Sequence, residues 1–480
     1  MRGLTLLRCV AFCVAGGMAG CGQTGQTGQT DAPSGPVLYE GARLIVGDDS
    51  AAIEDGTLLV ENGRISAIGQ SGAVTAPAGA ARVDLSGKTV MPTLVNGHMH
   101  PGYEGSPANN HANLGAENWT PENVLAHMQR EAYYGVGVVL SAGADETERA
   151  QRFEQDQAAG KFPPAARYVF GAGMDLPAGG PDAVLMKAAN TFNALYKATT
   201  PDEGRAQIQK IASRNIRHVK VWLDVREGAY SKLTPEINQT YVAIYDEAEK
   251  HQVKVHTHSR PLPDQKAAVR GGTDILVHTS PDPMDEEFLA LLRERRPYWT
   301  PVGGQGAMSV DPTVWCKDPF VNQGVPMRAL MATNSVVTGE PGQAGCNPHP
   351  PTVKANDVKF AETFRQMLGA GARLVLGTDI GVGRYMYGWA EHFTLARYVA
   401  FGLTPSQAIQ AATQRTAEML GLDDTGTLAA GKRADFIVLN ANPLDDIRNT
   451  RQIDSVYLGG VRLDREGLLA SWNKISLSTQ

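Results

Sequence analysis

The stretch Val90-Met91-Pro92-Thr93-Leu94-Val95-Asn96-Gly97-His98-Met99-His100 joins a short apolar strand to a pair of histidines. We expect the strand at Thr93–Val95, with the histidines closing it at the carboxyl end. Side chains two residues apart on a strand point to the same face, so His98 and His100 would point together. Imidazoles are ligands for zinc and related ions. The stretch therefore predicts a strand that carries two metal ligands.

The chain downstream alternates short apolar strands with amphipathic helical patterns such as Pro235–His251 and Met284–Arg295. Repeated strand–helix units indicate a parallel sheet of the α/β class. Eight units indicate a closed (β/α)8 TIM barrel, which we place at residues 91–420, although an open doubly wound sheet also fits the alternation. The expected strands are Thr93–Val95, Val136–Leu140, Tyr168–Phe170, His218–Trp222, Val253–Val255, Ile275–Val277, Tyr298–Val302 and Leu374–Leu376.

Both ends of the globular region have a different, β-rich texture. Short apolar runs are separated there by Asp-Gly and Asn-Gly, which are strong hairpin signals. We expect one small β-sandwich domain, built from residues 37–90 and 421–466. The runs are Ala42–Val46, Thr57–Val60, Arg64–Ile68, Asp435–Leu439 and Ser455–Leu458.

Further residues able to bind a metal fall on or just after the expected strands. Barrel enzymes keep their catalytic groups at the carboxyl ends of the strands. Each residue alone also fits a structural role, such as a core histidine, a lysine reaching solvent or an aspartate in a turn. Their joint placement on one rim favours a metal centre. The residues are Lys220, His256, His258, His278 and Asp379.

The opening stretch, Val90 to His100, resembles the opening signature of the amidohydrolase superfamily. Glu61-Asn62-Gly63-Arg64-Ile65 and Gly431-Lys432-Arg433-Ala434-Asp435-Phe436 resemble the paired β-sandwich segments of that superfamily. Val219-Lys220-Val221-Trp222 and Val255-His256-Thr257-His258 are most similar to the branch around imidazolonepropionase and the prolidase-like dipeptidases. The resemblance spans nearly all of the chain after residue 36 and implies a metal-dependent hydrolase.

The resemblance implies two divalent ions, which we expect to be zinc, with manganese or cobalt as alternatives. Lys220, carboxylated by carbon dioxide, would bridge the two ions, whereas imidazolonepropionase lacks this lysine and binds one metal. Carboxylation needs a neutral amine, so the site must lower the pKa of Lys220. The remaining implied ligands are His98, His100 and Asp379 for the first ion, and His256 and His278 for the second.

The implied chemistry is hydrolysis of an amide or peptide C–N bond in small peptides or N-acyl amino acids. A water shared by two cations loses a proton readily, its pKa falling toward ~7, and the resulting hydroxide attacks the carbonyl carbon. Asp379 would act as general acid and base, and His258 would serve the substrate or support the site. Alternatives are the same centre acting on a lactone, carbamate, cyclic imide or phosphoester, or a non-enzymatic lipoprotein.

Specificity should come from the loops after the strands, which would bind a small-molecule substrate. Tyr103 follows the first strand, and the aromatic segment Gly383–Trp389 follows the eighth. Arg384, within that segment, could bind a substrate carboxylate through two hydrogen bonds, although a solvated arginine fits equally. Asp224 after the fourth strand fits either a helix cap or a substrate contact.

The first residues have the pattern of an export signal. Arg2 and Arg8 give a positive start, and the apolar run Val10–Met18 is too short to span a bilayer. Met18-Ala19-Gly20-Cys21 resembles a lipobox, which predicts a signal peptide at residues 1–20 and a lipid on Cys21. A buried amino-terminal helix is the alternative.

The next segment, residues 21–36, repeats Gly-Gln-Thr and contains few apolar residues, so it predicts a flexible tether. Gly22 gives no inner-membrane retention aspartate. We therefore expect a lipoprotein on the periplasmic face of the bacterial outer membrane, anchored through Cys21.

Two cysteines remain in the exported part, Cys316 and Cys346, both within the long Pro/Gly-rich segment Gly303–Asn356. An oxidising compartment would favour a disulfide between them, although two separate thiols also fit. The segment is expected to lie over the active face. The formal charge is −6 and no basic stripe appears, which argues against nucleic-acid binding. Oligomeric state is left open by the sequence.

Overall fold

A computed structural model describes residues 35–103, 116–181, 190–191, 193–224, 231–301, 318–323, 351–381 and 387–478. The predicted signal peptide at 1–20, the lipid site Cys21, nearly all of the tether, Arg384 and the Cys316–Cys346 pair lie outside these residues. Among the described helices, none has the length and apolarity needed to cross a membrane.

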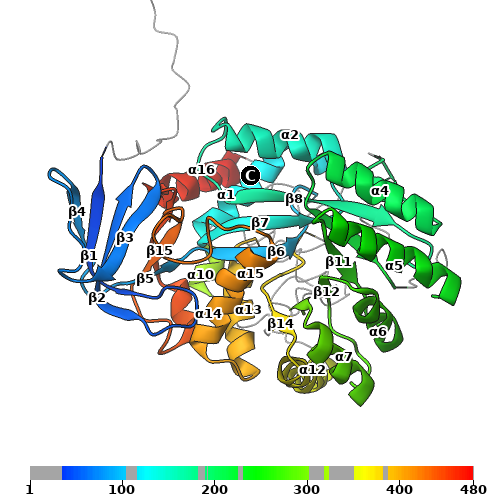
Figure 1. Ribbon diagram of the computed structural model, residues 1–480. Helices are drawn as coiled ribbons and strands as arrows, with labels where there is room; N and C mark the ends of the chain where they lie inside the picture. The colour runs from blue at the N-terminus through cyan, green and yellow to red at the C-terminus, as the bar shows by residue number, and fades with distance from the viewer. Residues whose placement is uncertain are drawn as a thin grey trace, which may run out of the picture.

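The larger part of the described chain is a parallel sheet wrapped by helices (Figure 1). Its strands are hydrogen-bonded in chain order, as the strand–helix alternation predicts. They are β6 (Leu94–Met99), β7 (Val136–Ala142), β8 (Arg167–Asp175), β10 (His218–Trp222), β11 (Lys254–His258), β12 (Ile275–Val277), β13 (Tyr298–Thr300) and β14 (Arg373–Leu374), with β9 (Leu195–Lys197) pairing beside β8.

Backbone hydrogen bonds then join the last strand region to the first. Gly97 N donates to Leu376 O at 2.8 Å, Asp379 N to His98 O at 2.8 Å, and His100 N to Ile380 O at 2.7 Å. The sheet therefore closes into a TIM-barrel-like ring, and the open doubly wound alternative is excluded.

Of the eight predicted strands, only His218–Trp222 and Ile275–Val277 have the observed bounds, and for two of the other six the physical reason is clear. The strand expected at Tyr298–Val302 ends at Thr300 because Pro301 follows and has no N–H to continue the ladder. The strand expected at Val253–Val255 runs instead over Lys254–His258, since its histidines pair with the neighbouring strand β10.

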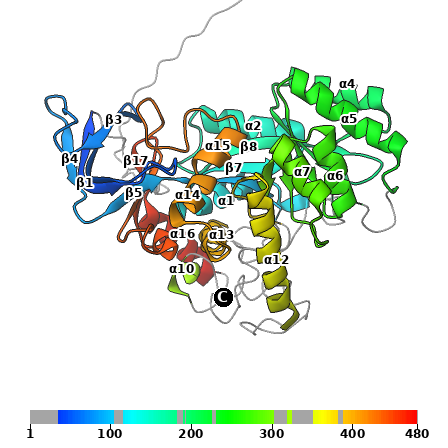
Figure 2. The same ribbon diagram turned by 60° about the horizontal axis from the view of Figure 1, so that its bottom comes forward.

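The outer helices begin with clear sequence signals. Thr120, Thr200, Thr234 and Thr404 are each an N-cap followed by proline, and each side chain accepts a hydrogen bond from a first-turn N–H. The helices are α1 (Pro121–Tyr133), α2 (Thr147–Ala158), α4 (Pro201–Ser213), α5 (Pro235–Lys250), α6 (Leu262–Gly271), α7 (Glu286–Arg295), α12 (Pro351–Gly369), α13 (Trp389–Ala400), α14 (Pro405–Ala412) and α15 (Gln414–Met419), with the short α10 (Pro319–Asn322) and the 3-10 turns η2 (Ala116–Asn118) and η3 (Ile447–Arg451). Figure 2 shows α13, α14 and α15 on the side nearest the second sheet.

A second, mixed sheet combines strands from both ends of the described chain (Figure 1). β5 pairs antiparallel with β15, so Met91 and Ile437 are partners. Its core includes Tyr39, whose ring packs edge-on against the ring of Phe436 with 5.2 Å between the ring centres. The strands are β1 (Val37–Leu44), β2 (Ile53–Glu61), β3 (Arg64–Gln70), β4 (Ala81–Asp84), β5 (Thr89–Pro92), β15 (Phe436–Leu439), β16 (Ile453–Leu458) and β17 (Val461–Arg462).

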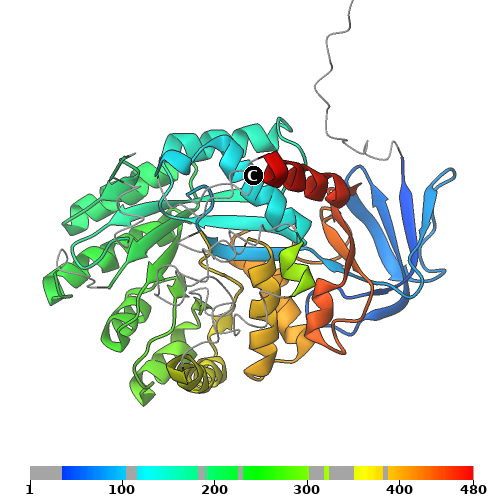
Figure 3. The same cartoon turned by 180° about the vertical axis from the view of Figure 1, so that it is seen from behind.

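The terminal helix α16 (Arg465–Ser478) returns from this sheet to the barrel and lies along α1 (Figure 3). The guanidinium of Arg130, on α1, lies 4.2 Å from the ring centre of Trp472 on α16. Cation–π contact and burial of the indole thus dock the end of the chain onto the barrel.

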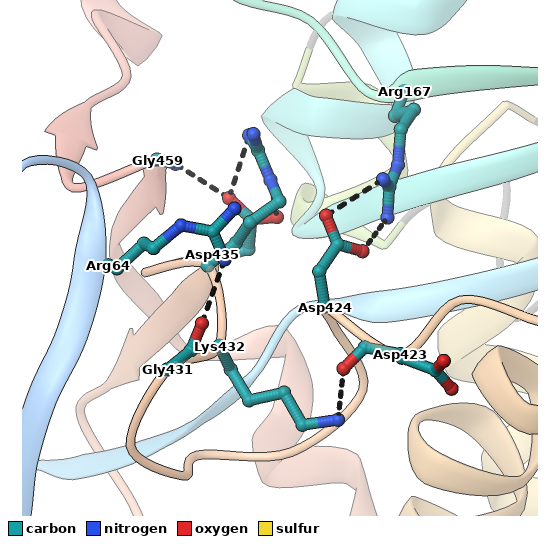
Figure 4. Close-up of polar contacts among 9 residues, drawn as sticks. Arg64, Arg167, Asp423, Asp424, Gly431, Lys432, Asp435 and Gly459 are labelled. Atoms are coloured by element: carbon teal, nitrogen blue, oxygen red, sulfur yellow. Dashed lines mark hydrogen bonds and ion pairs between the residues drawn. The ribbon is translucent and has the colours of Figure 1, made fainter.

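The segment Gly431–Phe436 has a structural role at the junction of the two sheets (Figure 4). Asp435 is 6% exposed, and its carboxylate accepts hydrogen bonds from Gly459 N at 2.6 Å and from Arg433 Nε at 2.9 Å. Nearby, Arg167 on β8 forms an ion pair with Asp424 at 2.9 Å. The segment thus connects β15 to the turn between β16 and β17.

We expect Asp435→Ala to lower the free energy of unfolding by about 1 to 3 kcal/mol, because Gly459 N and the Arg433 guanidinium would lose their partner. Chemical denaturation would measure the change. Asp435→Asn is the matched control, since its amide oxygen can still accept from Gly459 N and should recover part of the loss. Equal stability of all three proteins would contradict this role.

A partly buried carboxyl on α2 predicts a pH effect on stability. Glu154 accepts a hydrogen bond from Phe170 N at 2.7 Å, and burial raises its pKa from 4.5 to about 7. The folded protein therefore holds this proton between pH 4.5 and 7, and the stability it contributes is lost as pH rises through that range.

Glu154→Gln keeps the acceptor oxygen and removes the charge. Its free energy of unfolding relative to the unmutated protein should rise by about 3 kcal/mol between pH 4.5 and 8. Urea denaturation at several pH values would measure the difference. A difference independent of pH would show that Glu154 is not the group responsible.

Candidate metal centre

His98 and His100 on and just after β6 meet Asp379 from the segment after β14. Asp379 Oδ1 lies 3.0 Å from His100 Nε2 and 3.3 Å from His98 Nε2. Among the described residues these three form the group of ligand atoms, all within 4.8 Å of one another, that could hold a metal ion. Both histidines are buried, whereas the Asp379 side chain is 21% exposed.

The backbone is strained where it presents these side chains. Asp379 has φ of 57° and His278 has φ of 74°, in the left-handed region that non-glycine residues seldom adopt. Gly381 is required nearby, because a Cβ there would lie 1.8 Å from His100 O. The chain thus crosses the mouth of the barrel in close contact with β6.

Lys220 comes from β10 to the same group. Its side chain is buried and its Nζ lies 3.1 Å from His98 Nε2. Gly143 makes room for it, since a Cβ at that position would lie 2.4 Å from Lys220 Cβ. The amine therefore lies buried beside an imidazole of the predicted ligand set.

Of the other predicted histidines, His256 and His258 lie on β11 and His278 follows directly after β12, and each contacts a partner side chain. His256 Nε2 lies 3.1 Å from His218 Nδ1. His258 Nδ1 lies 2.7 Å from His278 Nε2, and the ring of His278 is centred 6.3 Å from that of His98. The structure therefore brings the predicted ligands to one end of the barrel. His256 and His278 lie beside the group of His98, His100 and Asp379 and are not part of that group.

Burial sets the protonation state of these imidazoles. Burial, with a smaller contribution from the nearby Lys220, lowers the pKa of His98 from 6.5 to about 3, although Asp379 acts in the opposite direction. Burial likewise lowers the pKa of His256 and His278 well below the ordinary value. Neutral imidazoles are the form that binds metal.

The donor set fits a divalent ion. One Asp379 oxygen is shared by two imidazole nitrogens, and the buried Nδ1 atoms of His98, His100 and His256 have no hydrogen-bond partner among the described residues. Buried polar atoms are rarely left without a partner. Imidazole with carboxylate is the combination that suits zinc and its neighbours.

A hydrogen-bond network behind the site was not predicted from the sequence. Asn96 Oδ1 accepts from His98 N at 3.0 Å, and Asn96 Nδ2 donates to Thr378 Oγ1 at 2.8 Å and to Glu391. Burial raises the pKa of Glu391 to about 7. Asn96 thus links the backbone that carries His98 to the residue that precedes Asp379. Its position inside the quoted opening stretch was the available signal.

The predicted substrate contacts have mixed outcomes. Tyr103 is 1% exposed and its hydroxyl donates to Ala144 O at 2.6 Å, so its role toward substrate stays a prediction. Among the described residues Asp224 caps no helix: its carboxylate oxygen lies 3.1 Å from His258 Nε2, and Thr234 caps the next described helix, α5.

Comparison with known proteins identifies the family to which this chain belongs. A model of the amidohydrolase family matches residues 89–463, so the chain belongs to the amidohydrolase family. It is 27% identical over 438 residues to the imidazolonepropionase of Deinococcus radiodurans, covering 86% of this chain and 94% of the relative. The chain is accordingly an enzyme that hydrolyses C–N bonds.

Solved structures share the fold. A Xaa-Pro dipeptidase with bound methionine superimposes with a TM-score of 0.67 at 21% identity, over 89% of this chain and 99% of that one. Phenylurea hydrolase B gives 0.68 at 20% identity, over 90% and 97%. At these identities the likeness concerns the fold alone.

We expect His100→Gln to weaken binding of a divalent ion by more than the roughly 10- to 100-fold that follows loss of an outer partner, because a direct ligand is removed. Chelator competition on purified protein would measure the affinity. The matched control is His392→Gln, another buried histidine, which lies 2.7 Å from Tyr134 O. Equal affinity in both variants would contradict the assignment of His100.

Proposed function

We propose that this protein is a metal-dependent hydrolase that cleaves the amide or peptide C–N bond of small peptides or N-acyl amino acids. The observation that supports it most directly is the convergence of His98, His100 and Asp379 with Lys220 at the carboxyl ends of the barrel strands. Family membership supports the reaction class.

Two divalent ions, zinc with manganese or cobalt as alternatives, would be held by the predicted ligand set. His98, His100 and Asp379 would hold one, His256 and His278 the other, and carboxylated Lys220 both. Such ions would lower the pKa of a water toward ~7 and polarise the substrate carbonyl. The buried, neutral imidazoles support this assignment.

Asp379 is the residue placed to move protons. Its Oδ1 lies against two imidazoles, yet its side chain is more exposed than either of them. It can therefore accept a proton from the attacking water and deliver it to the departing nitrogen. The two ring nitrogens of His258 contact Asp224 and His278. His258 would therefore keep the ring of His278 in position, or contact the substrate.

The dipeptidase among the structural neighbours supports peptide-like substrates, and the presence of Lys220 supports the same branch. Export as an outer-membrane lipoprotein, with a signal at residues 1–20 and a lipid on Cys21, remains part of the proposal. Such a protein would meet small peptides in the periplasm.

The full chain, loaded with zinc, should hydrolyse members of a panel of dipeptides and N-acyl amino acids, and Asp379→Ala should lower kcat by roughly 10²- to 10⁴-fold. Product amines would be quantified by chromatography. Lactones, carbamates, cyclic imides, aryl ureas and aryl esters complete the panel. Turnover confined to that second group would replace the proposed substrate class, and unchanged amide hydrolysis by Asp379→Ala would remove the mechanism.

A further inference from the structure

His218, the first residue of β10, is a buried histidine that the proposed mechanism does not use. It is 3% exposed and lies two residues before Lys220 on the same strand. Its Nε2 lies 3.2 Å from Leu420 O, and its Nδ1 lies 3.1 Å from His256 Nε2. The ring centres of His218 and His256 are 5.3 Å apart.

These two contacts fix which nitrogens carry hydrogen. A carbonyl oxygen only accepts, so His218 Nε2 must donate to Leu420 O. A neutral imidazole has one N–H, which leaves His218 Nδ1 as an acceptor. His256 Nε2 must then donate to it, and His256 Nδ1 is left with the lone pair.

The remaining nitrogen of His256 agrees with this reading. His256 Nδ1 is buried and has no hydrogen-bond partner among the described residues. Its ring lies beside Lys220, its direct partner in the register of β10 and β11. A buried lone pair without a donor is suited to a cation.

We propose that His218 is a positioning residue that holds His256 in the tautomer with Nδ1 free, which makes Nδ1 the atom that binds the second ion. The inference rests on the proposed function in taking His256 as a ligand. The anchor is Leu420 at the end of α15, which packs in the same cluster as the inward-facing Val95, Val138 and Val375.

Two variants separate the contacts of His218. In His218→Asn the amide oxygen can take the place of Nδ1 and accept from His256, but the side chain is too short for Leu420. In His218→Gln the longer amide can still donate to Leu420 O, but it offers no acceptor at the Nδ1 position. Each variant therefore keeps one of the two contacts of His218 and loses the other.

The readout is zinc stoichiometry and affinity for each ion, measured by chelator competition on the full chain, together with the Tm of the metal-free protein. We expect His218→Gln to weaken binding of the second ion by roughly 10- to 100-fold. His218→Asn should bind it nearly as the unmutated protein does. The Tm of metal-free His218→Gln should stay near that of the unmutated protein, because its link to Leu420 is kept.

Equal zinc affinity in the two variants would overturn the inference, as would weaker zinc binding by His218→Asn than by His218→Gln. An unmutated protein that binds fewer than two ions would instead overturn the proposed two-metal centre, and this inference with it. NMR of the metal-free protein with ¹⁵N-labelled histidine needs no variant. A protonated Nε2 and bare Nδ1 on both His218 and His256 is expected, and the opposite tautomer on either would refute the proposal.

Discussion

The site depends on how the ends of the barrel sheet meet. The segment after β14 lies beside β6 and exchanges backbone hydrogen bonds with Gly97, His98 and His100. These bonds hold Asp379 opposite the two histidines, although about 280 residues separate them in the chain. Without closure of the sheet, the three ligand atoms would have no common position.

Burial gives the site its chemical character. Burial in the barrel interior disfavours imidazolium, so His98 and His278 are neutral and their lone pairs are available. The same burial makes an unsatisfied ring nitrogen costly, which is why outer partners such as His218 and Asp224 matter. The positive φ at His278 and Asp379 is backbone strain that the surrounding barrel must hold in place.

Local pattern predicted much of this protein. Alternation of apolar strands and amphipathic helices gave the barrel, and Thr-Pro pairs mark several helix starts. The strand ends were less predictable, because β13 ends where proline removes a donor and β11 extends through its histidines by pairing with β10. Asn96 and His218 were missed as functional candidates, since their roles depend on partners far away in the chain.

The sequence by itself determined the strand–helix order and the placement of the candidate ligands at strand ends, because these follow from periodicity within a few residues, whereas the choice of those side chains as ligands came from the resemblance to the amidohydrolase superfamily. Only the tertiary structure decided that the sheet closes, that Asp379 shares one oxygen between His98 and His100, and that Asp224 contacts His258. Those relations are set by packing between distant segments, and no local pattern encodes which distant atom a side chain will meet.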